Sequence, residues 1–353
     1  MEIVPVDPFD RDAFDAWHGA YFQAELASGE GVASPWQLEE FRAIAQNPGS
    51  SRWLALYAGL VSGHVVATGM VMTPLLDNTD RAELLVHTVP AARRRGHGTA
   101  MLAHLEVVAR DRGRTVLVAE SSWPYAAGPD GAGEPGREFA RRTGFDLALG
   151  DVKRVLRLPV PDAVLDELAA EAALRHGGHE LRSWAGPVPD ELLDGWARLS
   201  SLVITEAPTG DLDVEPECRD ASVIRENEEV LARQGRTKYN TLALDPGGVP
   251  VAYTDLVTTV HEPGRAWQFG TLVDRAARGR RLGLAVKVAN LRLLQAERPD
   301  IEVVSTYNAE SNTHMIEVND RIGFAPVARL GEFQMRTSGP SSRGPEGRSP
   351  VSR

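Results

Sequence analysis

Two short motifs occur twice along the chain at nearly the same spacing, and this repetition limits the possible folds more than any other feature. An R-R-R-G-H-G run at 93–98 is matched by R-G-R-R-L-G at 278–283, and T-G-F at 143–145 is matched by I-G-F at 322–324. The last glycines of the first two runs lie 185 residues apart, and the glycines of the other two lie 179 residues apart. A near-constant offset indicates an internal duplication, so each half is expected to form one copy of the same unit.

The order of the expected elements is also the same in the two halves. Alternating apolar and β-branched residues predict strands, and apolar residues on one face of a 3.6-residue period predict helices. Antiparallel strands followed by a strand–helix–strand unit predict the α+β class, with a mixed, mostly antiparallel sheet flanked by helices in each half. The runs are strands at 52–59, 64–73, 82–89 and 115–119 with a helix at 98–112, and then strands at 240–244, 251–260, 267–273 and 301–306 with a helix at 282–295.

Composition marks the expected limits of the two units. Prolines follow a strand-like run that ends at Leu158, and two glycines end the helical segment after it. The end of the chain is rich in Gly, Pro, Ser and Arg and has too few apolar residues to order itself. We therefore expect an N-terminal domain at 1–158, a linker with a helix at 159–179, a C-terminal domain at 180–336 and a disordered tail at 337–353.

Length and composition exclude several classes of protein. A chain of 353 residues has the length of two domains of ~100–200 residues each. No apolar run approaches the ~18 residues of a membrane span, and no leader is apparent at the N-terminus. The net charge of −11 opposes binding to nucleic acid, and the single cysteine, Cys218, excludes an intramolecular disulfide and a cysteine metal cluster. A cytoplasmic protein without a metal is expected, and its oligomeric state stays open.

The duplicated basic runs have the composition of anion-binding loops. Each follows a strand and precedes a helix, where free N–H groups and the helix dipole favour phosphate oxygens. Glycine lets the backbone approach the anion, although a basic turn without a ligand would look similar. The candidate residues are Arg93, Arg94, Arg95, Gly96, His97, Gly98 and Thr99 in the first half, and Arg278, Gly279, Arg280, Arg281, Leu282 and Gly283 in the second.

With these loops and the later Gly-Phe pairs, the sequence resembles the GNAT superfamily of acetyl-CoA-dependent N-acyltransferases. Its R-x-x-G-x-G core is matched by the first loop from Arg93 to Gly98. In the second loop Arg281 stands where the first glycine is usual, and a register that begins at Arg280 and uses Gly283 and Ala285 restores the spacing. Both registers remain open. The tandem arrangement is similar in architecture to actinobacterial two-domain acetyltransferases such as mycothiol synthase.

This resemblance implies acetyl-CoA as co-substrate, with its pyrophosphate on the loop N–H groups and its pantetheine arm beside the fourth strand of each half. It also implies that asparagines after the following strand touch the arm or the adenosine phosphates. The alternative is that these asparagines only turn and cap the chain. The residues implied are Val86, His87 and Thr88 in the first half, and Thr271, Leu272, Val273, Asn308 and Asn312 in the second.

The resemblance further implies a carboxylate base on the fourth strand and a tyrosine acid before the Gly-Phe pair. Glu83 has the position of the base in the first half, although an exposed strand charge is an equal interpretation. Gln268 replaces it in the second half, so Asp255 on the preceding strand is the nearest candidate. Ala140 and Asn319 occupy the tyrosine positions, so the usual acid is missing from both halves.

We therefore expect an acetyl-CoA-dependent N-acetyltransferase whose acceptor is an amine of a small molecule or peptide. A non-catalytic acyl-CoA-binding protein or sensor is the alternative, because both tyrosines are missing. The acidic segment at 206–215 would suit a cationic amine near the acceptor site, or it is an ordinary solvated loop.

Overall fold

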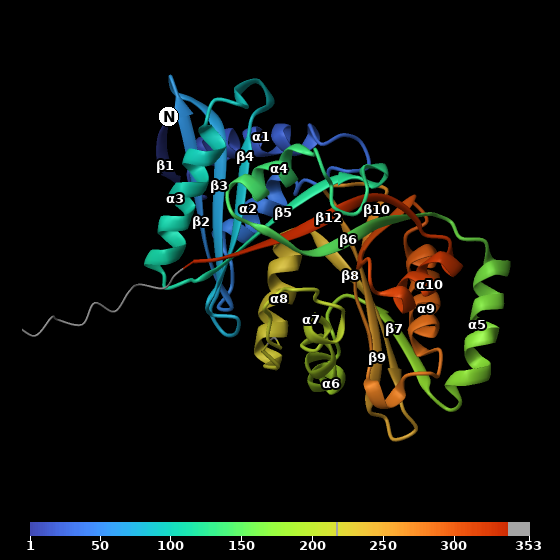
Figure 1. The fold of residues 1–353 in the computed structure, drawn as a ribbon. Helices are drawn as coiled ribbons and strands as arrows, with labels where there is room; N and C mark the ends of the chain where they lie inside the picture. Colours follow the sequence, from blue (N-terminus) through green and yellow to red (C-terminus); the bar gives the residue numbers. More distant parts are fainter. Residues whose placement is uncertain (217, 338–353) are drawn as a thin grey trace, which may run out of the picture.

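The computed structural model describes residues 1–216 and 218–337, and its strands form one continuous twelve-stranded sheet (Figure 1). From one edge to the other the order is β1-β2-β3-β4-β5-β12-β6-β11-β10-β9-β8-β7. Residues 338–353 of the expected tail lie outside the described residues. The strands are β1 (Glu2–Val6), β2 (Arg52–Val61), β3 (His64–Pro74), β4 (Arg81–Thr88), β5 (Val116–Pro124), β6 (Asp146–Arg157), β7 (Glu180–Ala185), β8 (Arg236–Leu244), β9 (Pro250–Thr259), β10 (Arg265–Val273), β11 (Val303–Ala309) and β12 (Ala325–Arg336).

The two halves exchange their last strands. The first five strands of the N-terminal half are followed in the sheet by β12, whereas those of the C-terminal half are followed by β6. β12 pairs with the whole length of β5, from Ala328↔Pro124 to Arg336↔Val116, and β6 pairs with β11 from Val303↔Arg157 to Ala309↔Asp151. The exchanged strands lie side by side between the halves (Figure 1). The α+β class is confirmed, and the part of the sheet that each half builds is completed by a strand of the other half.

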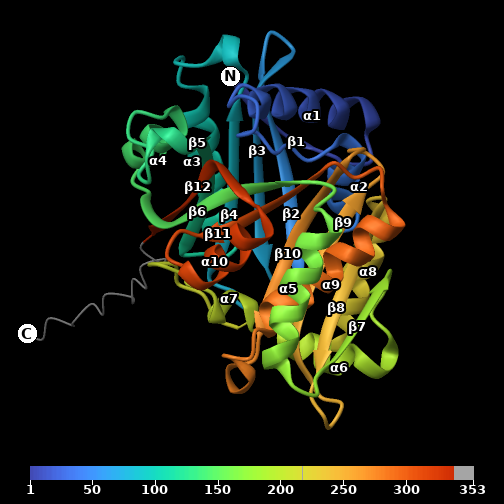
Figure 2. The same cartoon turned by 90° about the vertical axis from the view of Figure 1, so that its right-hand side faces the viewer.

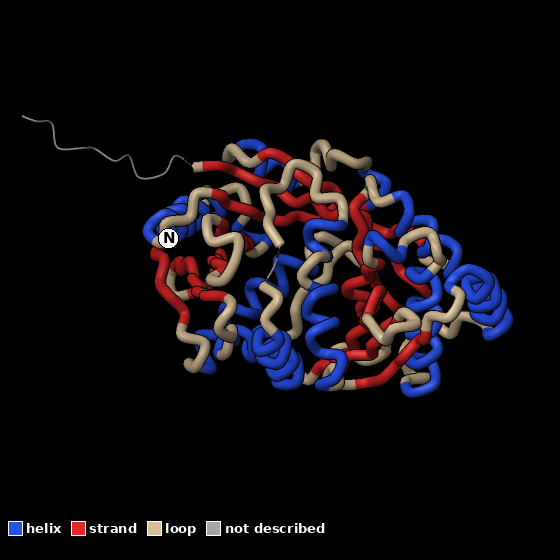
Figure 3. Tube along the Cα trace, turned by 90° about the horizontal axis from the view of Figure 1, so that it is seen from below, coloured by secondary structure: helices blue, strands red, loops and turns tan. Residues whose placement is uncertain are grey.

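Helices cover both faces of the sheet, as the view from below shows (Figure 3). Neighbouring residues of β4 explain this, because Leu84 packs with Met101 of α3 and Leu85 packs with the cluster around Trp17 of α1. The α-helices are α1 (Arg11–Leu26), α2 (Leu38–Gln46), α3 (His97–Asp111), α4 (Pro135–Arg142), α5 (Asp162–His176), α6 (Asp190–Ser200), α7 (Val203–Glu206), α8 (Ala221–Arg233), α9 (Leu282–Glu297) and α10 (Thr313–Ile322), and the short 3₁₀ turns are η1 (Pro90–Ala92), η2 (Tyr125–Ala127) and η3 (Arg275–Ala277).

The helix expected in the linker, α5, packs on the C-terminal half. Its Leu165 and Leu168 share one apolar core with Leu284 and Leu291 of α9 (Figure 2). On the other face of this half, Trp196 of α6 packs in a separate core against the sheet. Within the described ranges, no helix is long and apolar enough to cross a lipid bilayer. The domain limits at residues 158 and 180 stay a prediction.

Candidate functional site

Each half contains a pair of parallel strands that separate after three residues. β4 pairs with β5 only through Arg81–Glu83 and Val116–Val118, and β10 pairs with β11 only through Arg265–Trp267 and Val303–Ser305. Beyond these points one edge of β4 and of β10 has no ladder partner among the described strands, so a strand-like arm can pair there. These free edges contain the residues predicted to contact the pantetheine arm, Val86, His87, Thr88, Thr271, Leu272 and Val273.

The first loop presents its backbone at the start of α3. Arg93 has an extended backbone and directs its guanidinium back, with Nε donating to the carbonyl of Thr88 at 3.1 Å and Nη2 to the carbonyl of Ala24 at 3.1 Å. Arg94 and Gly96 have positive φ angles of 64° and 84°, and no side chain caps the helix. The first-turn N–H groups therefore stay available to an anion. Arg95 and Thr99 are exposed, and His97 and Gly98 are half-buried.

The second loop has the same backbone path, which decides between its two registers. Arg278 is extended like Arg93, and its Nε donates to the carbonyl of Val273 at 3.2 Å. Gly279 and Arg281 have positive φ angles of 81° and 57°, which matches Arg94 and Gly96. The geometry therefore equates Arg278 with Arg93, not Arg280. Leu282, however, is only 1% exposed and belongs to the core.

The arginines of the two loops differ in their partners. Glu206, at the end of α7, pairs with Arg275 at 2.8 Å and with Arg278 at 2.7 Å, and Glu171 pairs with Arg281 at 3.3 Å. In the first loop, no described carboxylate forms an ion pair with the arginines at 93–95. An incoming phosphate must therefore compete with carboxylates at the second loop but not at the first.

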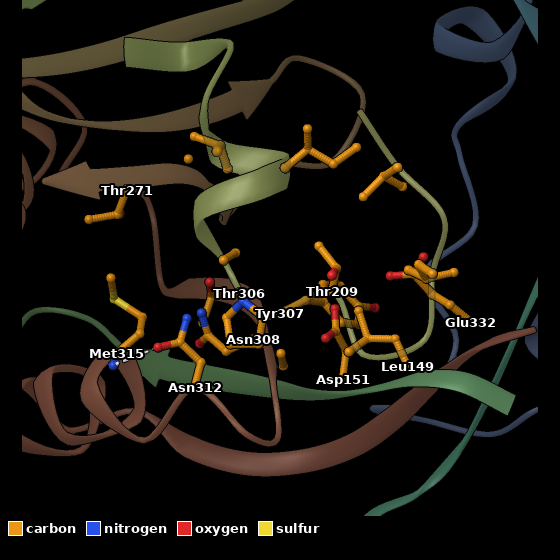
Figure 4. A pocket seen from close by; sticks show the side chains of 18 of the residues that line it. Leu149, Asp151, Thr209, Thr271, Thr306, Tyr307, Asn308, Asn312, Met315 and Glu332 are labelled. Atoms are coloured by element: carbon orange, nitrogen blue, oxygen red, sulfur yellow. Dashed lines mark hydrogen bonds between the residues drawn. The ribbon is translucent and has the colours of Figure 1, made fainter. Parts of the chain in front are cut away.

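A cavity joins the separated strands β10 and β11 to the exchanged strands (Figure 4). Thr271, Asn312 and Met315 lie at one end of it, and Asp151 and Glu332 lie at the other (Figure 4). The first end belongs to the C-terminal half, where the arm of acetyl-CoA is predicted. The second end is made by β6 and β12, so the strand exchange completes the cavity.

Residues of the acidic segment at 206–215 line this cavity, but the carboxylates of Asp213 and Glu215 have partners outside it. Asp213 pairs with Arg336, and Oε1 of Glu215 accepts the backbone N–H of Asn78 at 2.5 Å. The residues of this segment that line the cavity are Ala207, Pro208, Thr209, Leu212 and Val214. The segment therefore borders the cavity with mostly apolar side chains and ties it to the N-terminal half.

Four carboxylates gather on one face of the central strands. Glu120 of β5 lies opposite Glu332 of β12. Asp151 of β6 is paired with the β12 residue two positions before Glu332, so it lies on the same face of the sheet. Glu83 of β4 points to this face too, because its partner Val118 precedes Glu120 by two residues. Arg81 lies in the same region, lines the cavity and is 8% exposed.

The pKa of each carboxylate in this cluster is raised above its ordinary value. Burial raises the pKa of Glu120 to about 8, with further contributions from the charges of Glu332, Glu83 and Asp151. Glu120 nevertheless keeps part of its surface exposed to solvent. Burial also raises the pKa of Asp151 to about 7, again with the charge of Glu332. Burial raises the pKa of Glu332 and of Glu83 as well, and Arg81 partly opposes both shifts. The cluster can therefore hold a cation or accept a proton.

The two predicted bases occupy different surroundings. Glu83 lies in the carboxylate cluster, although it does not line the cavity. Asp255 is 5% exposed, forms an ion pair with Lys238 at 2.8 Å and does not line the cavity either. Gln268 donates to the carbonyl of Asp255 at 2.6 Å, so it serves the packing of β9 and β10. Both predicted bases stay predictions, and only Glu83 has the charge environment of a base.

The asparagines of the second half combine two roles. Asn312 caps α10 by accepting the backbone N–H of Met315 at 3.2 Å, and it also lines the cavity. Asn308 lines the cavity and accepts a hydrogen bond from Asn319 at 2.6 Å. Asn319, in the position of the usual tyrosine, is fully buried. The capping alternative is therefore correct for Asn312, and cofactor contact stays a prediction for Asn308 and Asn312.

In the N-terminal half, His87 already has a partner. Its Nε2 lies 2.5 Å from Oε1 of Glu25, and its ring packs edge-on against Tyr21. Nearby, Oγ of Ser34 lies 3.0 Å from the hydroxyl of Tyr307 in the other half, and it accepts a hydrogen bond at 2.7 Å from Lys153 of the exchanged strand β6. The N-terminal half thus helps to build the wall of the second half's cavity.

Sequence reasoning missed several residues that line the cavity. Asp151 and Glu332 belong to the exchanged strands, and no local pattern indicates that these strands leave their own half. Arg81 begins β4 and looks like an ordinary strand-end charge. Lys287 did carry a signal, because it interrupts an apolar run in α9, and Tyr307 is an aromatic at the end of a buried strand.

Comparison with known families agrees with this geometry. A model of the acetyltransferase (GNAT) family matches residues 12–123, which span β2 to β5 and the first loop. No curated protein matches the sequence significantly. The resemblance to GNAT proteins is therefore confirmed for the first half by sequence and extends to the second half through structure.

Solved structures resemble the whole chain. One is a tandem GNAT protein from the clavulanic acid biosynthesis pathway, solved without acetyl-CoA, with 28% identity, a TM-score of 0.77 and coverage of 97% of this chain and 99% of that one. A GCN5-related N-acetyltransferase from Sphaerobacter thermophilus has 16% identity, a TM-score of 0.63 and 95% coverage of both chains. N-myristoyltransferase from Saccharomyces cerevisiae, with bound myristoyl-CoA and inhibitors, has 13% identity, a TM-score of 0.56 and coverage of 95% and 80%. The last two support the fold alone.

Proposed function

Since the chain has the fold of the tandem GNAT acetyltransferases, we propose that it is an acetyl-CoA-dependent N-acetyltransferase that acts on a cationic amine of a small molecule or peptide. The observation that carries this proposal is the cavity that extends from the free edge of β10 to the carboxylates Asp151 and Glu332. A donor thioester at one end and an amine at the other would share this cavity, which favours reaction through proximity.

Asp151 is the proposed base of this site. An amine acceptor is an ammonium ion at neutral pH and must lose a proton before it attacks a thioester carbon. Asp151 lines the cavity, and its Oδ1 is buried without a hydrogen-bond partner. With its pKa raised to about 7, chiefly by burial, its carboxylate can accept that proton near neutral pH. Glu332 then supports the binding of the ammonium group by charge.

The two loops have separate proposed roles. The second loop, with Asn308 and Asn312, holds the acetyl-CoA that reacts in the cavity. The first loop holds another molecule of acetyl-CoA, because its arginines face no described carboxylate and its first-turn N–H groups are open. Glu83 stays the proposed base if the first half is also active.

The non-catalytic alternative has a specific observation in its favour. Ala140 and Asn319 replace the tyrosine acid. In addition, Glu206 already forms ion pairs with two arginines of the second loop region. If those pairs persist when acetyl-CoA is present, only the first loop binds it and the protein is a binder or sensor. Turnover with a panel of amines separates the two functions.

The test compares three proteins by mass spectrometry of the acetylated amine: the wild type, Asp151→Asn and Glu83→Gln. We expect Asp151→Asn to lower turnover ~10²–10⁴-fold at neutral pH, the usual range for loss of a general base. Glu83→Gln removes the other candidate base, which lies in the same cluster but does not line the cavity, so the comparison shows which half carries out the reaction. A large loss in Glu83→Gln alone moves the chemistry to the first half, and absence of turnover in the wild type with every amine favours the binder.

A further inference from the structure

Lys287 is a buried cation without a counter-ion in the part of the chain that the structure describes. It lies on α9, is 1% exposed and lines the cavity. Its Nζ lies 5.5 Å from the ring centre of Phe324, and no described carboxylate pairs with it. Burial is the one cause that lowers the pKa of Lys287, to about 7, and neither the neighbouring strands nor α10 contributes a charge to that shift.

The fold does not need a lysine at this position. The repeat offset equates Lys287 with Leu102 of α3, which is 3% exposed and packs in the apolar core of the first half. An uncompensated buried charge costs free energy that a leucine or methionine would not. A residue that opposes stability in a ligand cavity is a candidate for function.

The helix brings Lys287 to the place where the strands separate. A Cβ placed on Gly283 would lie 3.6 Å from Val273, near the end of β10. Since α9 returns along the sheet and rises ~5.4 Å per turn, Lys287 is beside the residues that precede Val273. Those residues include Gly270 and Thr271, which line the cavity at the bulge of β10. The reactive end of a pantetheine arm would lie beside these cavity residues, near the start of the free edge of β10.

We propose that Lys287 is the acid of the C-terminal half and donates a proton to the sulfur of the departing CoA. This rests on the proposed function and fills the role for which Asn319 is unsuited. When the carbon–sulfur bond breaks, its electron pair goes to sulfur, and a proton from the Nζ ammonium forms the S–H bond. Lys287 becomes a neutral amine and regains a proton from solvent. Asp151 passes the proton from the acceptor ammonium to solvent, and the amide nitrogen loses its extra proton to water.

The acidity of Lys287 suits this step. An ammonium with a pKa of about 7 is a stronger acid than a thiol, whose ordinary pKa is ~8.5, so the transfer runs downhill. Above its pKa the amine is neutral and cannot donate. The rate is therefore expected to fall on the alkaline side through loss of the Lys287 proton, and on the acidic side through protonation of Asp151.

The experiment compares Lys287→Met and Lys287→Arg with Leu102→Met, the matched change at the equivalent core position. We expect both Lys287 variants to lower kcat ~10²–10⁴-fold with KM for acetyl-CoA nearly unchanged. The fall of the rate at alkaline pH should also disappear in both variants. Lys287→Met should also unfold at a higher temperature than the wild type, since it removes the buried charge. Leu102→Met should leave the pH–rate profile as in the wild type.

A binding measurement tests the same contact without an acceptor. In a Gly98→Asp background, which blocks the first loop, calorimetry compares CoA with desulfo-CoA. We expect a preference for CoA that Lys287→Met abolishes. An unchanged preference together with an unchanged kcat and pH profile overturns the proposal for Lys287. Lack of turnover in the wild type overturns the proposed function instead, and the CoA comparison still decides whether Lys287 faces the sulfur.

Discussion

Glu120 and Glu332 face each other directly across β5 and β12, although they come from opposite halves of the chain. Two carboxylates in such a pair repel one another, which disfavours ionisation of both. The repulsion exists only because β12 crosses into the first half. The strand exchange therefore brings these carboxylates together, and the charge of Glu332 adds to burial in raising the pKa of Glu120.

The first prediction concerns stability and pH. The pKa of Glu120 is raised in the folded protein, chiefly by burial, to about 8, well above its ordinary value. Its contribution to stability is therefore complete in mild acid and is lost as the pH rises to about 8. We expect Glu120→Gln to melt at a higher temperature than the wild type at pH 8 and to lose this advantage at pH 5. Melting curves between pH 5 and pH 8 test this prediction, with Glu297→Gln on an exposed helix end as the control. An equal change of melting temperature with pH in all three proteins contradicts it.

The second prediction concerns the first loop. Gly98→Asp places a carboxylate at the phosphate site, and its Cβ would lie 3.3 Å from Oγ1 of Thr88. We expect acetyl-CoA affinity at this loop to fall at least ~10-fold, which corresponds to ~1.4 kcal/mol. Calorimetry measures it, and Gly19→Asp, which adds the same charge in open space on α1, is the control. If the stronger of two binding events survives in Gly98→Asp, it does not belong to the first loop.

The third prediction concerns Glu206. This carboxylate holds Arg275 and Arg278, which an incoming pyrophosphate would need. In the Gly98→Asp background, we expect Glu206→Gln to raise acetyl-CoA affinity by up to about fivefold, the factor that an exposed ion pair of ~1 kcal/mol represents. Glu229→Gln breaks an exposed pair with Arg233 away from the loop and should have no effect. A loss of affinity in Glu206→Gln would mean that the pair supports the site.

The fourth prediction separates the two roles of Asn312. Asn312→Ala removes the cap of α10 and should cost ~1 kcal/mol of stability as well as any cofactor contact. Asn312→Asp keeps an oxygen that can cap the helix but loses the amide donor. We expect Asn312→Asp to retain the melting temperature while acetyl-CoA binds more weakly. Equal affinity of Asn312→Asp and the wild type in the Gly98→Asp background would leave Asn312 with its capping role alone.

Local sequence signals were sufficient to predict the two anion-binding loops. The order of arginines and glycines between a strand and a helix is read directly from the chain, and Arg93 and Arg278 have the same backbone conformation. The register of the second loop needed the structure, because Arg281 adopts a positive φ that sequence rules reserve for glycine. Neighbours in the chain thus predict the kind of loop, and backbone geometry selects the register.

The duplicated order of strands and helices, the two phosphate-type loops and the missing tyrosines follow from the residues, since each depends on contacts within a short segment. The residues do not show which half of the sheet contains β6 and which contains β12. Both strands have twelve residues and both follow a Gly-Phe pair, so either can complete either sheet by its own backbone hydrogen bonds. The choice depends on how the remaining chain packs around them. Folding therefore brings Asp151 and Glu332 to the cavity of the second half, although no pattern in the chain had indicated these two carboxylates.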